Sequence, residues 1–350
     1  MQLFPRLRLV PDGTQIAFMK GRHAGLIFSA VLSILSVILY FAPGLNYGID
    51  FKGGIIIEAR TPQAVDFTTL RPAMAGLNLG QVGLQQFGTA QDVLIRLERQ
   101  RADTAERCRA KRAPANDQER LARARPVTEE EAQQCAVEEV RAGLEKHQAG
   151  TQVRRVEAVG GSVSRELFFN GMLALGLSLL AMLVYIWFRF EWQFGVGAVI
   201  TLVLDVTKVV GFYVLTGFQF NLTAIAAILT IMGYSINDKV VVYDRMRENL
   251  RKYKSMPLRQ LIDLSINETL SRTIGTSMAT FLATIPLALV GGEALEEFAI
   301  TMLFGIVLAT SSSIFIAAPI LLLLGENKLR RGAVEPASDK AIDANASSPS

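Results

Sequence analysis

Apolar residues in this chain gather into long uninterrupted runs, not into the short periodic stretches typical of a soluble core. Six runs are long enough for a helix to cross the hydrocarbon core of a bilayer, since a helix rises about 1.5 Å per residue. They cover residues 24–42, 167–188, 194–216, 222–242, 273–290 and 298–324. The pattern predicts an all-α membrane bundle of six helices.

The region between the first two runs has a different pattern, in which short alternating segments flank two helical ones. Strands are expected at 54–60, 81–87, 92–99 and 152–159, and helices at 64–75 and 128–147. Thr128 and Glu131 fit a capping box at the start of the second helix. The order β-α-β-β-α-β predicts an α+β domain with a ferredoxin-like fold.

These patterns divide the chain into five parts. We expect an N-terminal segment at 1–23, the first transmembrane helix at 24–42, and the ferredoxin-like domain at 43–166. The other five transmembrane helices follow at 167–325, and a disordered tail at 326–350. Residues 100–126 are charged and nearly free of large apolar side chains, which favours a solvated insertion in the domain.

The basic residues set the orientation in the membrane. The connection between the fourth and fifth runs is rich in arginine and lysine, as are both ends of the chain. By the positive-inside rule, both termini are cytoplasmic and the ferredoxin-like domain lies outside the cytoplasm. The first run is too long for the apolar part of a signal peptide, so we interpret it as an uncleaved anchor. Topology explains the net charge of +4, and nucleic acid is not an expected partner.

The candidate chemistry outside the apolar runs is sparse. Cys108 and Cys135 are the only cysteines, and the sequence leaves open a disulfide between them or two free thiols. His23 and His147 are isolated, so no metal-binding spacing is present. The chain has no P-loop signature for ATP, and we expect it not to be an enzyme.

Asp238 is the most informative residue, because it lies inside the fourth apolar run. A carboxylate at that depth costs about 2.5–3.5 kcal/mol on insertion scales and commonly marks an ion, proton or substrate path. The alternative is an aspartate that only packs helices together. Asp205 and Lys208 lie three residues apart on one helix face, where a structural ion pair is the favoured interpretation.

Several motifs resemble the SecD/SecF family of protein-export membrane subunits, a branch of the RND transporter superfamily. The segment Gly48-Ile-Asp50-Phe-Lys-Gly53-Gly54 is similar to the family's G-I-D-F-x-G-G signature. The segment from Gly233 to Asn249, which contains Asn237, Asp238, Asp244 and Arg245, resembles the fourth-span motif of the SecF members. Residues 159–167, 190–192 and 205–206 also match the family, and the resemblance covers residues 15–325.

The resemblance implies a function. A SecF-type subunit pairs with SecD and uses the proton motive force to promote late steps of protein export through SecYEG, together with SecA. The further implied partners are YajC, exported polypeptides and the lipid of the bacterial inner membrane. No cofactor is implied, because protons are the coupling ion.

The resemblance also assigns site residues. Asp238 matches the family's proton-transport aspartate, and Arg272 matches the arginine that acts with it. Arginine keeps its proton, so near Asp238 it would be a fixed counter-charge. Lys239 departs from the small or hydroxyl residue expected there, and either Lys239 or Lys208 can pair with an aspartate and hold it ionised.

Two other functions remain open at this stage. One is a structural scaffold for the translocon without proton transport, in which Asp238 is replaceable by asparagine. The other is half of an RND-type small-molecule exporter, which would need a partner chain to complete about twelve spans. Asp50, between Gly48 and Gly53, is interpreted as a turn residue whose flanking glycines allow the soluble domain to approach the bundle.

Overall fold

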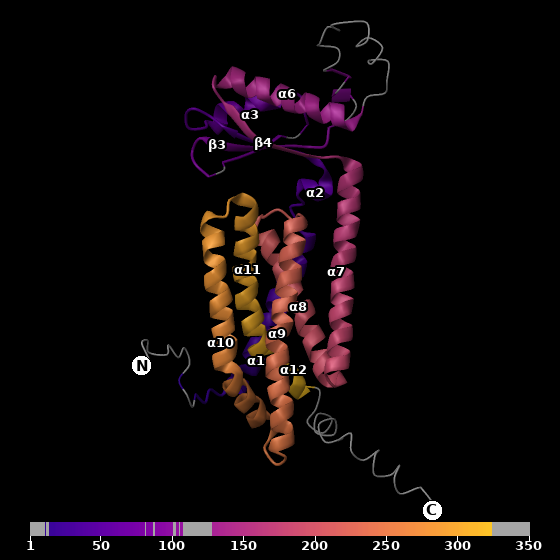
Figure 1. Ribbon diagram of the computed structural model, residues 1–350, viewed down its shortest axis with the longest axis vertical. Helices are drawn as coiled ribbons and strands as arrows, with labels where there is room; N and C mark the ends of the chain where they lie inside the picture. The colour runs from indigo at the N-terminus through magenta and orange to yellow at the C-terminus, as the bar shows by residue number, and fades with distance from the viewer. Residues whose placement is uncertain are drawn as a thin grey trace, which may run out of the picture. The chain divides into compact units, whose positions relative to one another are not determined.

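The computed structural model describes residues 11, 14–80, 82–86, 88–100, 103–104, 106–107 and 128–323. These residues form two compact units, which we treat separately (Figure 1). One unit comprises the described residues up to Asn46, then Leu175–Phe218 and the chain from Thr223 onward. The other comprises Tyr47–Ala174 and Gln219–Leu222.

The second unit is an α+β domain with the predicted ferredoxin-like topology. Its elements are β1 (Gly54–Arg60), α3 (Phe67–Ala75), β2 (Val82–Gln86), β3 (Asp92–Leu97), α6 (Glu129–His147) and β4 (Gln152–Val159). The strand order is β2-β3-β1-β4, and each neighbouring pair is antiparallel. Each helix therefore joins two strands that have a third strand inserted between them, which defines the ferredoxin-like split unit.

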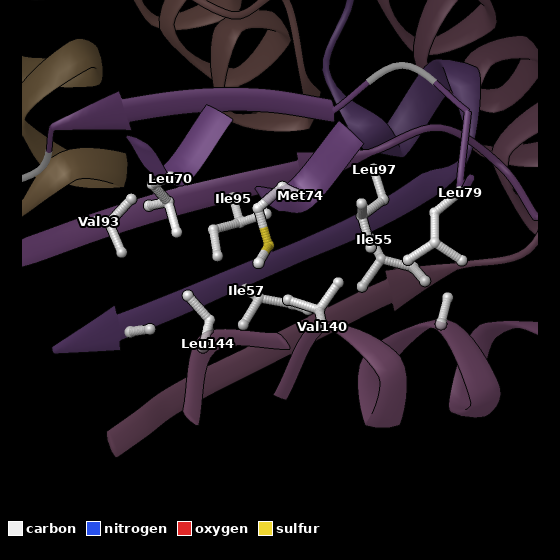
Figure 2. Packing of buried hydrophobic residues seen from close by; sticks show 12 residues of the cluster. Ile55, Ile57, Leu70, Met74, Leu79, Val93, Ile95, Leu97, Val140 and Leu144 are labelled. Carbon is white, nitrogen blue, oxygen red and sulfur yellow. The ribbon is translucent and has the colours of Figure 1, made fainter. Parts of the chain in front are cut away.

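The two helices of this domain pack on the same face of the sheet. Ile55 and Ile57 of β1 are fully buried, as are Val93 and Ile95 of β3, because alternate residues of a strand point to one face. Figure 2 shows these side chains in one cluster with Met74 of α3 and Val140 and Leu144 of α6. This cluster is the core of the domain.

Local signals explain where its helices begin. The Thr128 side chain accepts a hydrogen bond from the backbone N–H of Glu131, as the predicted cap requires. The first helix begins at Phe67 rather than at residue 64, because Asp66 caps it by accepting from the N–H of Thr68. A side-chain acceptor thus defines the start that hydrophobic periodicity alone placed three residues early.

The first unit is built from the long helices, although the second of them belongs to the other unit up to Ala174. Their bounds are α1 (Arg22–Phe41), α7 (Gly161–Arg189), α8 (Trp192–Thr216), α9 (Leu222–Lys252), α10 (Leu258–Val290) and α11 (Glu293–Ser312), the last continued by a π-helical turn (Ser313–Ala317) and α12 (Ala318–Leu323). A 3₁₀ turn (Phe18–Gly21) precedes α1. Six of the helical segments are long and apolar enough to cross a membrane, in agreement with the predicted bundle. Within this unit α1 packs on α8, and α10 packs on α11 (Figure 1).

Two features of the bundle differ from the predicted runs. The basic connection after the fourth run is mostly helical, because α9 continues to Lys252 and α10 begins at Leu258. The sixth run is not a regular α-helix, since the π turn at Ser313–Ala317 interrupts it. A π turn leaves backbone groups for other partners, and the Tyr243 hydroxyl donates to the carbonyl of Ala317 at 3.2 Å.

Several predictions fall on residues outside the described ones. These are most of the insertion at 100–126, the tail after residue 323, and Cys108. Cys135 is buried in α6, its sulfur lies 3.7 Å from the carbonyl oxygen of Thr104, and it is not a free thiol. The pairing of Cys108 with Cys135 stays a prediction.

Candidate functional site: a buried charge cluster in the helical unit

Four charged side chains are buried on two helices, α8 and α9, which an ion pair connects. Asp205 and Lys208 belong to α8, and Asp238 and Lys239 to α9. Each is at most 2% exposed. Charges at such depth are rare in membrane helices and point to function or to a specific internal pairing. We call these four residues the charge cluster.

Asp205 makes the most contacts in the cluster, since one of its carboxylate oxygens accepts three hydrogen bonds. Oδ2 accepts from Ser235 Oγ at 2.8 Å, from Lys239 Nζ at 2.9 Å and from Ser312 Oγ at 2.7 Å. The donors come from α9 and α11, so one carboxylate joins three helices. A charged acceptor with several donors is a strong arrangement where water is scarce.

The other oxygen of Asp205 is much less well satisfied. Lys208 Nζ lies 3.7 Å from Oδ1, which is an ion-pair distance but too long for a hydrogen bond. Both atoms are buried without a hydrogen-bond partner within the described part of the chain. The predicted Asp205–Lys208 pair is therefore present, but it is the weaker of the two contacts that Asp205 makes with lysines.

Lys239 turns into the bundle and does not extend along the helix toward its basic end. Its side chain is 1% exposed, and Nζ also contacts Ser312 Oγ at 3.3 Å and Ser235 Oγ. A lysine in this position has three donors, and they are directed to Asp205 and its hydroxyl neighbours. Lys239 is thus committed to Asp205, although Asp238 is the residue next to it in sequence.

Asp238 has no comparable partners. It is 2% exposed, and its Oδ2 is buried without a hydrogen bond to any described residue. Tyr234 lies one turn earlier on the same side of α9. The Tyr234 hydroxyl donates to Ser277 Oγ at 2.8 Å, and Ser277 shares a 2.7 Å hydrogen bond with Thr310. Hydroxyl groups of α10 and α11 therefore line the approach to this part of α9.

Arg272 is not brought to Asp238 in this structure. It lies on α10 with an exposed side chain and forms no ion pair within the described residues. Its role as the counter-charge of Asp238 stays a prediction, because a fixed pairing between the two is absent from this conformation.

The remaining residues of the fourth-span motif lie away from the cluster. Asn237 is exposed. Asp244 pairs with Arg189 of α7 at 2.5 Å, and Arg245 pairs with Glu268 of α10 at 2.7 Å. These motif positions thus connect α9 to the ends of its neighbours.

The glycine motif belongs to the α+β unit. Asp50 lies in a four-residue helix, α2 (Ile49–Lys52), instead of the predicted turn, and it accepts a 3.0 Å hydrogen bond from the N–H of Leu222. Gly54 has φ +141°, and a Cβ there would lie 2.5 Å from the carbonyl oxygen of Leu97. The close approach that requires glycine is therefore to β3 within the domain.

Ser235 and Ser312 were missed by the sequence reasoning, although both contact the charge cluster. Serines are common in membrane helices, so a serine alone is a weak signal. The spacing of Ser235 and Lys239, one helical turn apart, is the one indication that the two share a face. Among the described residues, no group of three His, Cys, Asp or Glu side chains converges as a metal site.

Comparison with known proteins places this arrangement in context. The family model for the protein export membrane protein SecD/SecF C-terminal region matches residues 139–327, and the model for the SecD/SecF GG motif matches residues 41–65. The chain is 42% identical to protein translocase subunit SecF of Rickettsia rickettsii over 336 residues, which is 96% of this chain and all of the relative. Its identity to the SecF subunit of Rickettsia bellii is 40% over 332 residues, with 95% and 100% coverage.

Solved structures agree with the sequence matches. The crystal structure of SecDF, a translocon-associated membrane protein from Thermus thermophilus, superposes with a TM-score of 0.71 at 32% identity. The match covers 89% of this chain and 39% of the SecDF chain. SecDF in a super-membrane-facing form gives a TM-score of 0.59 at 31% identity, with coverage of 94% and 40%. The chain therefore corresponds to less than half of a SecDF polypeptide.

Proposed function

Because the chain belongs to the SecD/SecF family of protein export membrane proteins and its relatives are SecF subunits, we propose that it uses the proton motive force to promote late steps of protein export. It would do so with SecD as its partner, at the SecYEG translocon with SecA. The chain corresponds to 39% of a SecDF polypeptide, so a SecD chain would supply the helices that complete the frame.

The single observation that carries the proposal is the difference in hydrogen-bond partners between the two buried aspartates, Asp205 and Asp238. Asp205 Oδ2 is saturated by Lys239 and two serines, and the resulting network holds three helices together. Asp238 Oδ2 is buried and has no such partner. A carboxylate that is paired with a lysine is stabilised in its ionised form and therefore binds a proton poorly. A buried carboxylate without hydrogen-bond donors is destabilised in its ionised form and therefore binds a proton more readily. We therefore assign proton binding to Asp238 and a structural role to Asp205.

The proposed role of Arg272 belongs to a different conformation. Here its side chain is exposed. A conformational change that brings Arg272 to Asp238 would favour the ionised carboxylate and release the proton. Moving one charge across 100 mV is worth about 2.3 kcal/mol, so a few protons are enough to bias a two-state motion.

The same family relationship supports the other parts of the proposal. The chain would lie in the bacterial inner membrane with both termini in the cytoplasm and its ferredoxin-like domain outside. It would act as a transport component and not as an enzyme. YajC, the exported polypeptide and membrane lipid would be its further partners.

The test is export into reconstituted vesicles that contain the complete translocase, with and without a proton gradient. Asn has the shape of Asp but cannot titrate, so Asp238→Asn should assemble and keep ATP-driven export while losing stimulation by the gradient. The matched control is Thr230→Val, an exposed position of the same helix outside the motif, which should respond like the wild type. Full stimulation in the Asp238→Asn protein would falsify the proton-carrier role and leave the scaffold function in its place.

A further inference from the structure

A second polar site lies at the basic end of the helical unit, where the C-terminal ends of α7 and α9 meet. A cavity of about 580 Å³ is lined there by Arg189, Asp244, Arg247, Glu248, Arg251 and Lys252. We call it the basic cavity. It shares no residue with the charge cluster, and the proposed proton path does not account for an open cavity at this position.

The lining carries more positive than negative charge, and its carboxylates are already engaged. Asp244 is shared by Arg189 at 2.5 Å and Arg247 at 3.8 Å. Glu248 accepts from Arg245 at 2.5 Å. Arg251 and Lys252 are exposed and form no ion pair within the described residues. The nearest influence of a carboxylate is from Glu191 on Arg251 and from Glu268 on Lys252, in both cases beyond ion-pair distance, so both cations can contact an anion in the cavity.

The charged groups behind the lining do not reverse this balance. Glu191 Oε1 lies 3.8 Å from Arg247 Nε, beyond hydrogen-bond range, and both Arg247 Nε and Glu191 Oε2 are buried without a hydrogen-bond partner among the described residues. With Glu191, Arg245 and Glu268 included, five cations still face four carboxylates. Arg247, which lines the cavity, thus keeps one buried donor without a hydrogen-bond acceptor among the described residues.

Two of the arginines are fixed in place before any ligand binds. The guanidinium carbons of Arg189 and Arg247 lie 5.1 and 5.7 Å from the centre of the Phe190 ring, which is 6% exposed. Cation–π contacts of this kind hold the side chains against a rigid surface. Less side-chain entropy is therefore lost when the cavity binds a ligand.

The surroundings of the cavity are those of a membrane interface. Trp187, Phe188 and Trp192 flank Arg189 at the junction of α7 and α8, and they are 70%, 85% and 48% exposed. Tryptophan at the end of a membrane helix is typical of the headgroup level. Basic cavities between helices at this level bind anionic lipid headgroups.

We propose that the basic cavity binds the phosphate headgroup of an anionic phospholipid. Arg251 and Lys252 make the first contacts with the phosphate, and Arg189 and Arg247 form the positive base of the site. The exposed Trp187 and Phe188 lie against the glycerol and the upper acyl chains. The volume is in the range of pockets that hold one small ligand. A free phosphate ion would use the same cations but not the aromatic side chains.

The test measures lipid binding to the purified full-length chain in a neutral detergent, by native mass spectrometry and by the melting temperature. We expect phosphatidylglycerol to be retained and to raise the melting temperature, with no such effect of phosphatidylcholine. The double variant R251Q/K252Q should bind phosphatidylglycerol about 30-fold less tightly, because each cation near an anionic lipid is worth about 1 kcal/mol. The control K20Q/R22Q removes the same charge from the start of α1 and should bind like the wild type.

Three outcomes would overturn the proposal. Unchanged phosphatidylglycerol binding in R251Q/K252Q would show that the cavity is not the site. Equal effects of phosphatidylcholine would show that headgroup charge is not recognised. Equal stabilisation by inorganic phosphate would show a site for soluble phosphate instead of lipid. Proton transport does not enter any of these readouts, so they are independent of the proposed export function.

Discussion

The partner of Lys239 decides the electrostatics of the charge cluster. Adjacent residues on a helix point about 100° apart, so Lys239 and Asp238 do not face the same neighbour. Lys239 faces α8 and meets Asp205 at 2.9 Å. The lysine that departs from the family pattern therefore neutralises an aspartate of another helix, and Asp238 forms no ion pair with any residue that the structure describes. Sequence reasoning identified all four charged residues but left this pairing open, because it depends on the rotation of α8 against α9.

Replacing Lys239 should lower the stability of the protein, and replacing Asp205 as well should restore much of the lost stability. Lys239→Met leaves the Asp205 carboxylate buried with Lys208, 3.7 Å away, as its one remaining cation among the described residues, which should destabilise the protein by about 3–5 kcal/mol. The double variant Asp205→Asn/Lys239→Met should be more stable than Lys239→Met alone. Melting temperatures in detergent measure this, with the exposed Lys20→Met as control. Additive losses in the double variant would show that the two residues are not coupled.

A second residue-scale prediction concerns pH and the ferredoxin-like domain. Arg60 donates two 2.7 Å hydrogen bonds to Asp92, and with the Thr89 hydroxyl they hold the pKa of this carboxyl well below its usual range. A lowered pKa stabilises the fold above the unfolded-state value of about 3.9, and the contribution is lost as the pH falls through that value toward the folded-state pKa. In acid, hydrogen exchange of β3 amides, corrected for intrinsic rates, should accelerate.

The control for that prediction is Asp92→Asn, which cannot ionise. Its β3 amides should be less protected than those of the wild type at neutral pH, and the difference should shrink as the pH falls below about 3.9 toward pH 3, because the unfolded wild-type chain then binds a proton while the folded carboxyl is still ionised. A difference that stays constant down to that pH would mean that the Arg60 contact does not depend on ionisation.

Helix packing in the bundle rests on small residues at close contacts, and sequence alone did not reveal which ones. A Cβ on Gly211 of α8 would lie 2.5 Å from Ser36 Cβ and 3.0 Å from Ser36 Cα of α1. Ser29, Ser33 and Ser36 form a buried stripe of small residues along α1. Small residues let membrane helices approach closely. The six spans were predictable from the length of the apolar runs. Which helices pack together depends on the size of individual side chains at the contacts, and the apolar runs do not show this.

Gly211→Ala should push α8 away from α1 and cost about 1–3 kcal/mol, because the new methyl group meets backbone-level atoms that cannot move aside. The matched control is Gly275→Ala in α10, where nothing lies within 4 Å of the new Cβ. The melting temperature of each purified variant is the measurement. A loss of equal size in both variants would point to a general effect of glycine replacement and not to the α1–α8 contact.

Regular elements of the ferredoxin-like domain were predicted closely, while the irregular turn in the helical unit was not predicted. The last strand, Gln152–Val159, has the predicted bounds, since its alternation and flanking residues are clear. The π turn at Ser313–Ala317 has no sequence signal, because every residue in it also fits an α-helix. It is stabilised by tertiary contacts such as that of Tyr243 with Ala317, and only the folded bundle provides them.

At the scale of the whole molecule, the topology is a prediction from charge that labelling can test. In a background without Cys108 and Cys135, we expect Ser255→Cys, in the turn between α9 and α10, to be protected from a membrane-impermeant maleimide in spheroplasts. Ala64→Cys, an exposed position of the ferredoxin-like domain, should be labelled. The reverse labelling pattern would invert the orientation and contradict the positive-inside argument. Permeabilised cells serve as the control, because both positions should react there.

The central claim is that Asp238, and not Asp205, is the carboxyl group that binds the proton. The most direct measurement is the infrared difference spectrum of the reconstituted chain between acidic and alkaline pH. A protonated carboxyl group appears in it through its carbonyl stretch. The account predicts that the wild-type spectrum minus the Asp238→Asn spectrum contains this band, and that the wild-type spectrum minus the Asp205→Asn spectrum does not. A band that persists in Asp238→Asn and vanishes in Asp205→Asn would contradict it.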